Sequence, residues 1–334
     1  MFTTPVALIA FNRPELTART LAVIRSARPR ELYLIVDGPR SSRPEDAAKC
    51  AATRAVLDDI DWPCEVHRRY ADRNLGLEAN VELGLDWLFA QVESAIVLED
   101  DCQAAPSFFR YAAELLDRYR DEPRVWQVSG SGLGVPSRLF DGDSYAFTAW
   151  ASVWGWATWA DRWQRHRKLF PRDHIGGDAP VRTVPWTPQP GMLVTRSGQR
   201  HFDDAVASSD TITHGWDKHW WLTMISLGGF AISPAVNMVE NVGWGEDATH
   251  GVAEGRRDHA AEELTFPLTH PQSVVLNAEV ERELELVLSR VGGRGAMLAR
   301  RLIRSPRVRH AGRTLINSRA GIATHRFISR IGSR

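Results

Sequence analysis

Short apolar runs alternate with amphipathic segments over the first 130 residues of the chain. Strand-length segments, most of them apolar, predict strands at 6–11, 32–36, 64–70, 95–98 and 125–129. Between them, apolar side chains recur every three or four positions, which predicts helices over 14–27, 44–60, 81–92 and 108–119. Repeated strand–helix–strand units predict an α/β fold with a mostly parallel central sheet flanked by helices. Ligands of such sheets bind beyond the carboxyl ends of the strands.

The first helix carries a start signal of its own. Asn12 is a suitable N-cap residue, Pro14 fits the first turn, and Glu15 stands at the capping-box position. We therefore expect the Asn12 side chain to cap this helix.

The pattern becomes irregular after residue 130. Residues 171–200 contain five prolines and four glycines with little periodicity, which indicates a long loop or lid beside a site. Helical spacing resumes at 216–227 and at 278–288. We therefore divide the chain into 1–130, an irregular second half of the same domain at 131–288, and a tail at 289–334.

The tail differs from the body in charge. The chain has 41 basic and 41 acidic residues, but residues 289–334 contain twelve arginines, no lysine and no acid. Leucine and isoleucine alternate with arginine there, as in Leu298 to Arg304, which predicts a basic amphipathic segment suited to an anionic membrane surface. A disordered basic tail or a nucleic-acid contact is the alternative, although we expect no nucleic-acid partner.

The apolar runs and the cysteines set the expected location. No run approaches the length of a membrane span, and the start lacks the features of a signal peptide. Three cysteines without CxxC spacing argue against a disulfide scaffold and a structural zinc site. We expect a cytoplasmic protein that is peripheral on the inner face of the cytoplasmic membrane if the tail binds there.

Three consecutive carboxylates, Glu99, Asp100 and Asp101, follow the predicted strand at 95–98. Their mutual repulsion raises some of their pKa values unless a cation neutralises them, and Mn²⁺ or Mg²⁺ prefers such oxygen ligands. The alternative is a solvated acidic turn before a helix at Pro106.

These residues carry a resemblance. The segment Ala95 to Gly130, with Glu-Asp-Asp, Ala105-Pro106 and Phe108-Phe109, resembles glycosyltransferases of the GT-A (Rossmann-like) fold, and among them the N-acetylglucosaminyltransferase I type. The opening segments Val6 to Arg13 and Leu32 to Gly38 are similar to that family's nucleotide-binding strands. Residues 152–159 and 241–250 resemble bacterial family-2-like sugar transferases, so the resemblance spans roughly residues 5–275.

The resemblance implies roles for particular residues. It makes 1–130 the nucleotide-sugar-binding half and 131–288 the acceptor-binding and catalytic half. Asp101 would bind the metal with His250 as a second ligand, or His270 in its place. The expected donor contacts are Arg13 and Asp37 at the nucleotide, Glu99 and Asp100 at the sugar and ribose, and the turn at Asn74 and Gly76. A plain loop glycine is the alternative for Gly76, which we expect to allow a positive φ or a close backbone approach.

Five of the thirteen tryptophans lie between Trp150 and Trp163. Flat indole rings suit sugar faces, and Gly155 would let the backbone approach an acceptor. A tryptophan-rich core wall is the alternative for most of these rings. We assign only Trp154 and Trp156 to the site.

We expect the catalytic base to be Asp217. It stands at the start of the predicted helix 216–227, where Trp216 and Trp221 could desolvate its carboxylate and raise its pKa. The segment 216–220 also resembles the base-bearing segment of N-acetylglucosaminyltransferases, although Lys218 replaces a second aspartate and leaves the register open within 217–219. The other candidates are Asp203, Asp204, Asp210, Glu246 and Asp247, and a helix-start aspartate that complements the dipole is the structural alternative.

Together these features predict an inverting, metal-dependent glycosyltransferase. Its donor would be a nucleoside-diphosphate sugar, with UDP as the expected nucleotide, and its acceptor a saccharide or lipid-linked saccharide hydroxyl. A sugar nucleotidyltransferase and a non-catalytic carbohydrate-binding protein are the alternatives. Against a nucleotidyltransferase, the chain lacks a glycine-rich basic signature near the first helix. A carbohydrate-binding protein would leave the carboxylate cluster without a role.

Overall fold

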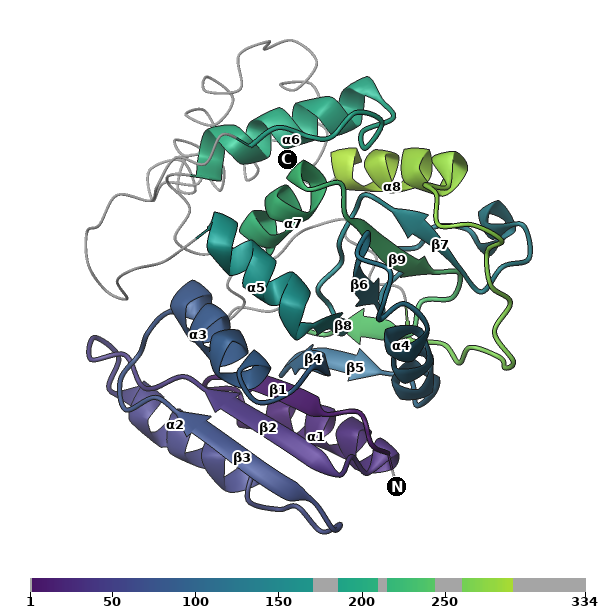
Figure 1. Cartoon of the computed structure of the whole chain (residues 1–334). Helices are drawn as coiled ribbons and strands as arrows, with labels where there is room; N and C mark the ends of the chain where they lie inside the picture. The colour runs from purple at the N-terminus through teal and green to yellow at the C-terminus, as the bar shows by residue number, and fades with distance from the viewer. Residues whose placement is uncertain (1, 171–185, 210–214, 244–259, 291–334) are drawn as a thin grey trace, which may run out of the picture.

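The computed structural model describes residues 2–170, 186–209, 215–243 and 260–290, and an eight-stranded sheet forms its centre (Figure 1). The strand order is β3-β2-β1-β4-β8-β6-β9-β7. The strands are β1 (Val6–Ala10), β2 (Glu31–Val36), β3 (Glu65–Tyr70), β4 (Ser94–Glu99), β6 (Val125–Ser129), β7 (Tyr145–Thr148), β8 (Trp156–Trp159) and β9 (Phe230–Pro234). β1 to β4 are parallel, and β8 lies antiparallel between β4 and β6. β9 is parallel to β6, and β7 pairs antiparallel with β9 at the edge.

Helices cover both faces of this sheet because side chains alternate along the strands. Leu8, Leu34 and Leu98 point to the face covered by α1 (Pro14–Ala27) and α4 (Ser107–Arg118), with α2 (Glu45–Val56) packed beside α1. Ile9 and Ile35 point to the opposite face. That face is covered by α3 (Leu77–Phe89), α5 (Ala160–Leu169), α6 (Arg196–Ser209), α7 (Trp216–Ser226) and α8 (Ala278–Arg290). The predicted class, an α/β Rossmann-like fold with a mostly parallel sheet flanked by helices, is confirmed.

A second, two-stranded sheet lies beside the carboxylate cluster. β5 (Cys102–Ala104) pairs antiparallel with β10 (Val239–Asn241), and the short 3₁₀ helix η1 (Ser137–Phe140) precedes β7. This pairing brings the segment around residue 241 against residues 101 and 102, which are far away in sequence.

The five predicted strands all form, with ends that differ by a residue or two. The irregular second half also holds elements that the pattern did not indicate: β7, β8, β9, β10, α5 and α6. The loop predicted over 171–200 is wrong at its end, where α6 begins at Arg196, and 171–185 lies outside the described residues. Strands from both predicted halves join one sheet, and the division at residue 130 stays a prediction.

The predicted cap of the first helix is wrong. Arg13 is the N-cap residue of α1, and no side chain caps the helix. Instead, the Asn12 amide nitrogen donates to Asp46 Oδ1 at 2.8 Å and ties the start of α1 to the start of α2. In the described parts of the chain, no helix has the length and apolarity to cross a membrane.

Candidate nucleotide-sugar site

A cleft of about 440 Å³ opens at the carboxyl ends of β1, β2 and β4. The segments that leave these three strands contribute Arg13, Asp37 and Asp100 to its wall. Its other polar lining residues are Asn12, Arg40, Arg43, Glu45, Asp46, Lys49, Asn74, Asn80 and Glu99. The structure therefore brings Arg13, Asp37, Asn74, Gly76, Glu99 and Asp100, six of the predicted site residues, to one cleft.

Three helices start at this cleft. Asn12 and Arg13 precede α1, Glu45 opens α2, and Gly76 precedes α3, and all four residues line the wall. The partial positive charge of each helix start favours an anion. Of the basic side chains on this wall, Arg40 is paired with Asp46, whereas within the described residues the Arg43 guanidinium makes no hydrogen bond or ion pair and adds positive charge. This part of the cleft is suited to a diphosphate.

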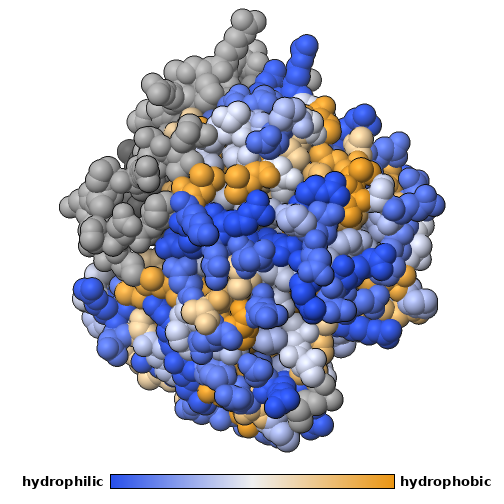
Figure 2. Space-filling model, in the orientation of Figure 1, coloured by the Kyte–Doolittle hydropathy of each residue, from blue (hydrophilic) through white to orange (hydrophobic). Residues whose placement is uncertain are grey.

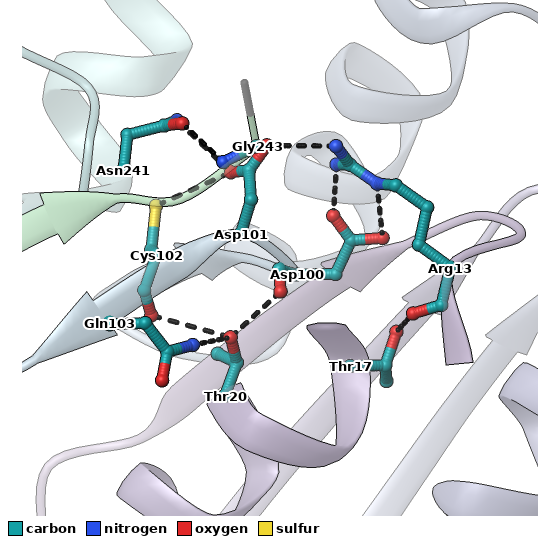
Figure 3. Close-up of polar contacts among 9 residues, drawn as sticks. All are labelled: Arg13, Thr17, Thr20, Asp100, Asp101, Cys102, Gln103, Asn241 and Gly243. Atoms are coloured by element: carbon teal, nitrogen blue, oxygen red, sulfur yellow. Dashed lines mark hydrogen bonds and ion pairs between the residues drawn. The ribbon is translucent and has the colours of Figure 1, made fainter. Parts of the chain in front are cut away.

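The carboxylate cluster faces the helix starts and is held by Arg13 (Figure 3). Both oxygens of Asp100 contact the Arg13 guanidinium, with Nε donating to Oδ2 at 3.3 Å and Nη2 paired with Oδ1. Nη1 of Arg13 lies 3.0 Å from Asp101 Oδ2. Burial opposes the charge of Arg13, but the two carboxylates outweigh it and raise the pKa of Arg13. One arginine thus bridges two adjacent aspartates.

Asp101 also contacts the neighbouring small sheet. Its Oδ1 accepts a hydrogen bond from the Asn241 amide nitrogen at 3.2 Å, and its carbonyl accepts from the Val242 N–H at 2.9 Å. A Cβ at Gly243 would stand 2.1 Å from Asp101 Oδ2, so the backbone can only lie this close because residue 243 is glycine. These contacts fix the Asp101 carboxylate beside Arg13, although Asp101 is not among the residues that line the cleft.

Burial is the main cause of unusual protonation in the cluster. Burial, then the negative charges of Asp101 and Asp100, raise the pKa of Glu99, and the charge of Asp217 adds to the effect. Burial likewise raises the pKa of Asp100, although Arg13 opposes this. The cluster therefore gains stability from a cation beside it.

The chemistry of this cluster fits a divalent cation. Asp100 and Asp101 supply the hard oxygen ligands that Mg²⁺ and Mn²⁺ prefer, and the position of the Arg13 guanidinium between them shows that positive charge is stabilised there. Within the described residues, the ligand atoms of Glu99, Asp100 and Asp101 do not all lie within 4.8 Å of one another, so a bound ion would need further ligands. His250, predicted as a second ligand, lies outside the described residues. The alternative His270 is engaged elsewhere, since its Nδ1 lies 2.9 Å from the Tyr145 hydroxyl and its Nε2 lies 3.7 Å from Glu114.

Asp37 reaches the cleft, but its carboxylate is already bonded to the chain. Oδ1 accepts from the N–H groups of Gly38 and Leu75, each at 2.8 Å. Oδ2 accepts from the Asn74 side chain at 2.8 Å and from the Gly76 N–H at 3.1 Å. Asp37 therefore holds the turn before α3, whose Gly76 has the expected positive φ of 84°.

Asp217 lies in the first turn of α7 and is exposed. Within the described residues its carboxylate has no hydrogen-bond partner, and its charge is close enough to raise the pKa of Glu99. The expected desolvation by Trp216 and Trp221 is wrong, because the Asp217 side chain is exposed to solvent whereas both rings are buried in the core. Of the other candidate bases, Asp203 and Asp204 lie on α6, and Asp210, Glu246 and Asp247 lie outside the described residues.

The assignment of Trp156 to the site is wrong. Its side chain is 1% exposed, and its ring packs between those of Trp216 and Trp220. Trp154 is partly buried against the core under α4 and does not line the cleft. Gly155 has a φ of 59° and packs on Val239, where a Cβ would meet a methyl group at 2.7 Å, so it serves packing rather than an acceptor.

The structure also reveals residues that the sequence reading missed. Asn80 lies on α3 one turn beyond Gly76, and its side-chain oxygen is buried without a hydrogen-bond partner in the described structure. Because Asn80 lines the cleft, its amide is available to a ligand. The only sign of this role in the sequence is that Asn80 lies four residues after Gly76, in the first turn of a helix that starts at the predicted site.

A second polar cluster, also missed, joins α3 to α5 and α7. Carboxylate and imidazole atoms of Glu78, Glu82 and His219 lie within 4.8 Å of one another, and all three residues are buried. His219 Nδ1 lies 3.0 Å from Glu78 Oε1, and Arg167 pairs with Glu82 at 3.0 Å. We interpret this cluster as an ion-pair network that fixes the three helices.

No protein-family model and no curated protein sequence matches this chain. Several solved structures share part of its fold. They include a UDP-glucose pyrophosphorylase complexed with UDP-glucose, with 9% identity and a TM-score of 0.29, over 52% of this chain and 82% of that chain. The galactosyltransferase LgtC has 13% identity and a TM-score of 0.30 over 50% of this chain and 62% of its own. Mouse xyloside xylosyltransferase 1 has 10% identity and a TM-score of 0.34 over 67% of this chain and 82% of its own. Scores this low do not assign an activity.

Proposed function

We propose that this protein is an inverting, metal-dependent glycosyltransferase that uses a nucleoside-diphosphate sugar, with UDP as the expected nucleotide. The observation that carries the proposal is the composition of one cleft, where three helix starts and free positive charge face a carboxylate cluster. Helix starts and positive charge bind a diphosphate, and carboxylates bind a metal ion beside that diphosphate.

The donor would lie along the wall formed by β1, β2 and β4. Its diphosphate would contact the helix starts and Arg43, and the amide of Asn80 would bond a polar group of the nucleoside. Asp101 would hold the metal, with His250 as a further candidate ligand. Mn²⁺ or Mg²⁺ bound there supplies positive charge that stabilises the leaving diphosphate.

The proposed reaction is a single displacement at the anomeric carbon. The acceptor oxygen forms a bond to this carbon while the bond from the carbon to the diphosphate oxygen breaks, which inverts the configuration. Asp217 accepts the proton of the acceptor hydroxyl. We propose a saccharide or lipid-linked saccharide as the acceptor, which would suit a protein held at the inner membrane face by its basic tail.

Donor hydrolysis tests the reaction class without a known acceptor. The protein is incubated with Mn²⁺ and a panel of nucleoside-diphosphate sugars, and separately with nucleoside triphosphates and sugar 1-phosphates. We expect slow release of a nucleoside diphosphate from one donor. Pyrophosphate release in the second reaction would instead identify a nucleotidyltransferase, and no turnover in either would favour a carbohydrate-binding protein.

A further inference from the structure

Arg13 is anchored by its backbone, and among the described contacts its guanidinium is held only by Asp100 and Asp101. Its carbonyl accepts hydrogen bonds from the Thr17 N–H and hydroxyl, each at 2.9 Å, which anchors the residue at the start of α1. Its side chain is 25% exposed and lines the cleft. The guanidinium can therefore leave the carboxylates without disturbing the helix.

The main chain at Asp100 and the carboxylate of Asp101, in contrast, are fixed from behind (Figure 3). The Thr20 hydroxyl donates to the Asp100 carbonyl at 2.8 Å, and the Gln103 amide donates to the Thr20 oxygen at 2.9 Å. Asp101 is held by Asn241 and lies against Gly243. The position between Asp100 and Asp101 is thus a rigid place for one positive group.

A guanidinium and a metal ion cannot occupy this position together. Both are cations, so they repel at short range, and both need the same oxygens of Asp100 and Asp101. An ion that binds Asp101 must first break its 3.0 Å contact with Arg13. Once released, the guanidinium still faces the cleft that we assign to the donor diphosphate.

We propose that Arg13 is the resident counter-ion of the carboxylate cluster, and that a divalent cation binds by displacing it toward the donor phosphates. The divalent cation and the phosphate ligand both rest on the proposed function, whereas the ion pair that has to break is seen in the structure. A metal ion that binds alone has to break the ion pair between Arg13 and the aspartates. A donor that binds alone does not gain the contact with Arg13, which stays paired. When both bind, the ion pair is broken once, the metal takes the aspartates and Arg13 contacts the donor. Arg13 therefore couples metal binding to donor binding.

The test measures Mn²⁺ binding to the full chain without nucleotide, by electron paramagnetic resonance of free Mn²⁺. We expect Arg13→Gln to bind Mn²⁺ about tenfold or more tightly than wild type, because the competing cation is gone. Arg43→Gln is the matched control, since it removes one positive charge from the same cleft but touches neither aspartate. We expect it to change the affinity by about twofold at most.

Two results would overturn the proposal: Mn²⁺ affinity in Arg13→Gln equal to or weaker than wild type, or an equal gain in Arg43→Gln. If Arg13→Gln does not fold, Arg13→Met replaces it, since methionine keeps an unbranched side chain but carries no charge. Mn²⁺ affinity in folded Arg13→Met equal to or weaker than wild type would then overturn the proposal. Because no donor is present, failure here leaves the proposed function standing, and a tighter Mn²⁺ site with no donor turnover would refute only that function.

Discussion

The carboxylates of the predicted site differ in their hydrogen-bond partners, and these partners indicate which of them has a structural role. Asp37 gives all its acceptor capacity to the turn at 74–76, and Asp100 gives both oxygens to Arg13. Asp217 is exposed and has no hydrogen-bond partner among the described residues. A proton acceptor must have a free oxygen, and the exposed carboxylate of Asp217 meets this need of the base that we propose, although Asp217 does not itself line the cleft.

Asp217→Asn should therefore bind donor and metal as wild type does but lose turnover. We expect donor hydrolysis to fall by about 100-fold or more, the usual effect of removing a general base. Asp203→Asn is the control, because this aspartate also lies on a helix of the second half and bonds only Gln199 among the described contacts. Near wild-type turnover in Asp217→Asn would assign the base to another carboxylate.

Asp46 predicts a pH dependence of stability. Hydrogen bonds from Arg40 lower the pKa of Asp46 to about 2, below its ordinary value. Because the folded-state pKa is depressed, this stabilisation is complete above pH 4 and is lost as the pH falls through 2. It corresponds to on the order of 2 kcal/mol.

Asp46→Asn should consequently lower the free energy of unfolding at pH 7 and flatten its decline between pH 4 and pH 2. Urea unfolding at both ends of this range measures the effect. Asp58→Asn is the control, because this carboxylate is exposed and has one ion pair, with Arg68. An unchanged pH profile in Asp46→Asn would contradict the assignment.

The sequence predicted residues whose role is set locally. Glu99 to Asp101 follow a strand, and Gly76 precedes a helix, so their places at the strand ends could be inferred from chain order. The partners of Asp37 and the burial of Trp156 depend on segments distant in sequence, and the sequence reading missed both.

At the scale of elements, β8 and α7 connect the cleft to the second half. Gln127 of β6 is fully buried and links α7 to the segment before β8, since its amide nitrogen donates to the Ser152 carbonyl at 2.6 Å and its oxygen accepts from Trp220 Nε1 at 2.7 Å. Trp220 lies on α7, one turn from Asp217. Gln127 therefore helps to position the helix that carries the proposed base.

Gln127→Met should destabilise the fold and disturb α7. The change leaves the Trp220 N–H and the Ser152 carbonyl buried without a partner, which costs about 1–3 kcal/mol. Gln91→Met is the control, because Gln91 is exposed and bonds only the Trp87 carbonyl among the described contacts. Equal unfolding free energies for the two variants would contradict this role.

Prediction of elements succeeded where burial follows apolarity. β1, β2 and β4 are almost wholly apolar, and their alternation with helices was visible in the sequence. Helix α5 was missed because it buries polar groups: Arg162 is 4% exposed and bonds the carbonyls of Val125, Arg120 and Glu122. A pattern of apolar positions assigns such residues to the surface.

For the whole molecule, charge separates the body from the tail. Residues 1–288 hold 29 basic and 41 acidic side chains, whereas residues 289–334 hold twelve arginines and no acid. On the face drawn in Figure 2, polar residues predominate over the described part of the chain, with scattered apolar patches. This separation leads us to propose the tail as the membrane-binding part.

The full chain should float with vesicles that contain anionic lipid and should not float with neutral vesicles. Each arginine near an anionic surface contributes about 1 kcal/mol, so even partial engagement of the tail would retain the protein. Truncation after Leu288 removes the tail and should abolish flotation. Equal flotation of the truncated chain would show that the tail is not the anchor.

The central claim is that the cleft binds a nucleoside diphosphate through a metal held by the carboxylate cluster. Calorimetric titration of a panel of nucleoside diphosphates, with and without Mn²⁺, tests it directly on wild type, Asp101→Ala and the surface control Asp58→Ala. We predict Mn²⁺-dependent binding of one nucleotide to wild type and Asp58→Ala, and loss of that dependence in folded Asp101→Ala. Absence of binding to wild type, or unchanged Mn²⁺-dependent affinity in Asp101→Ala, would contradict the claim.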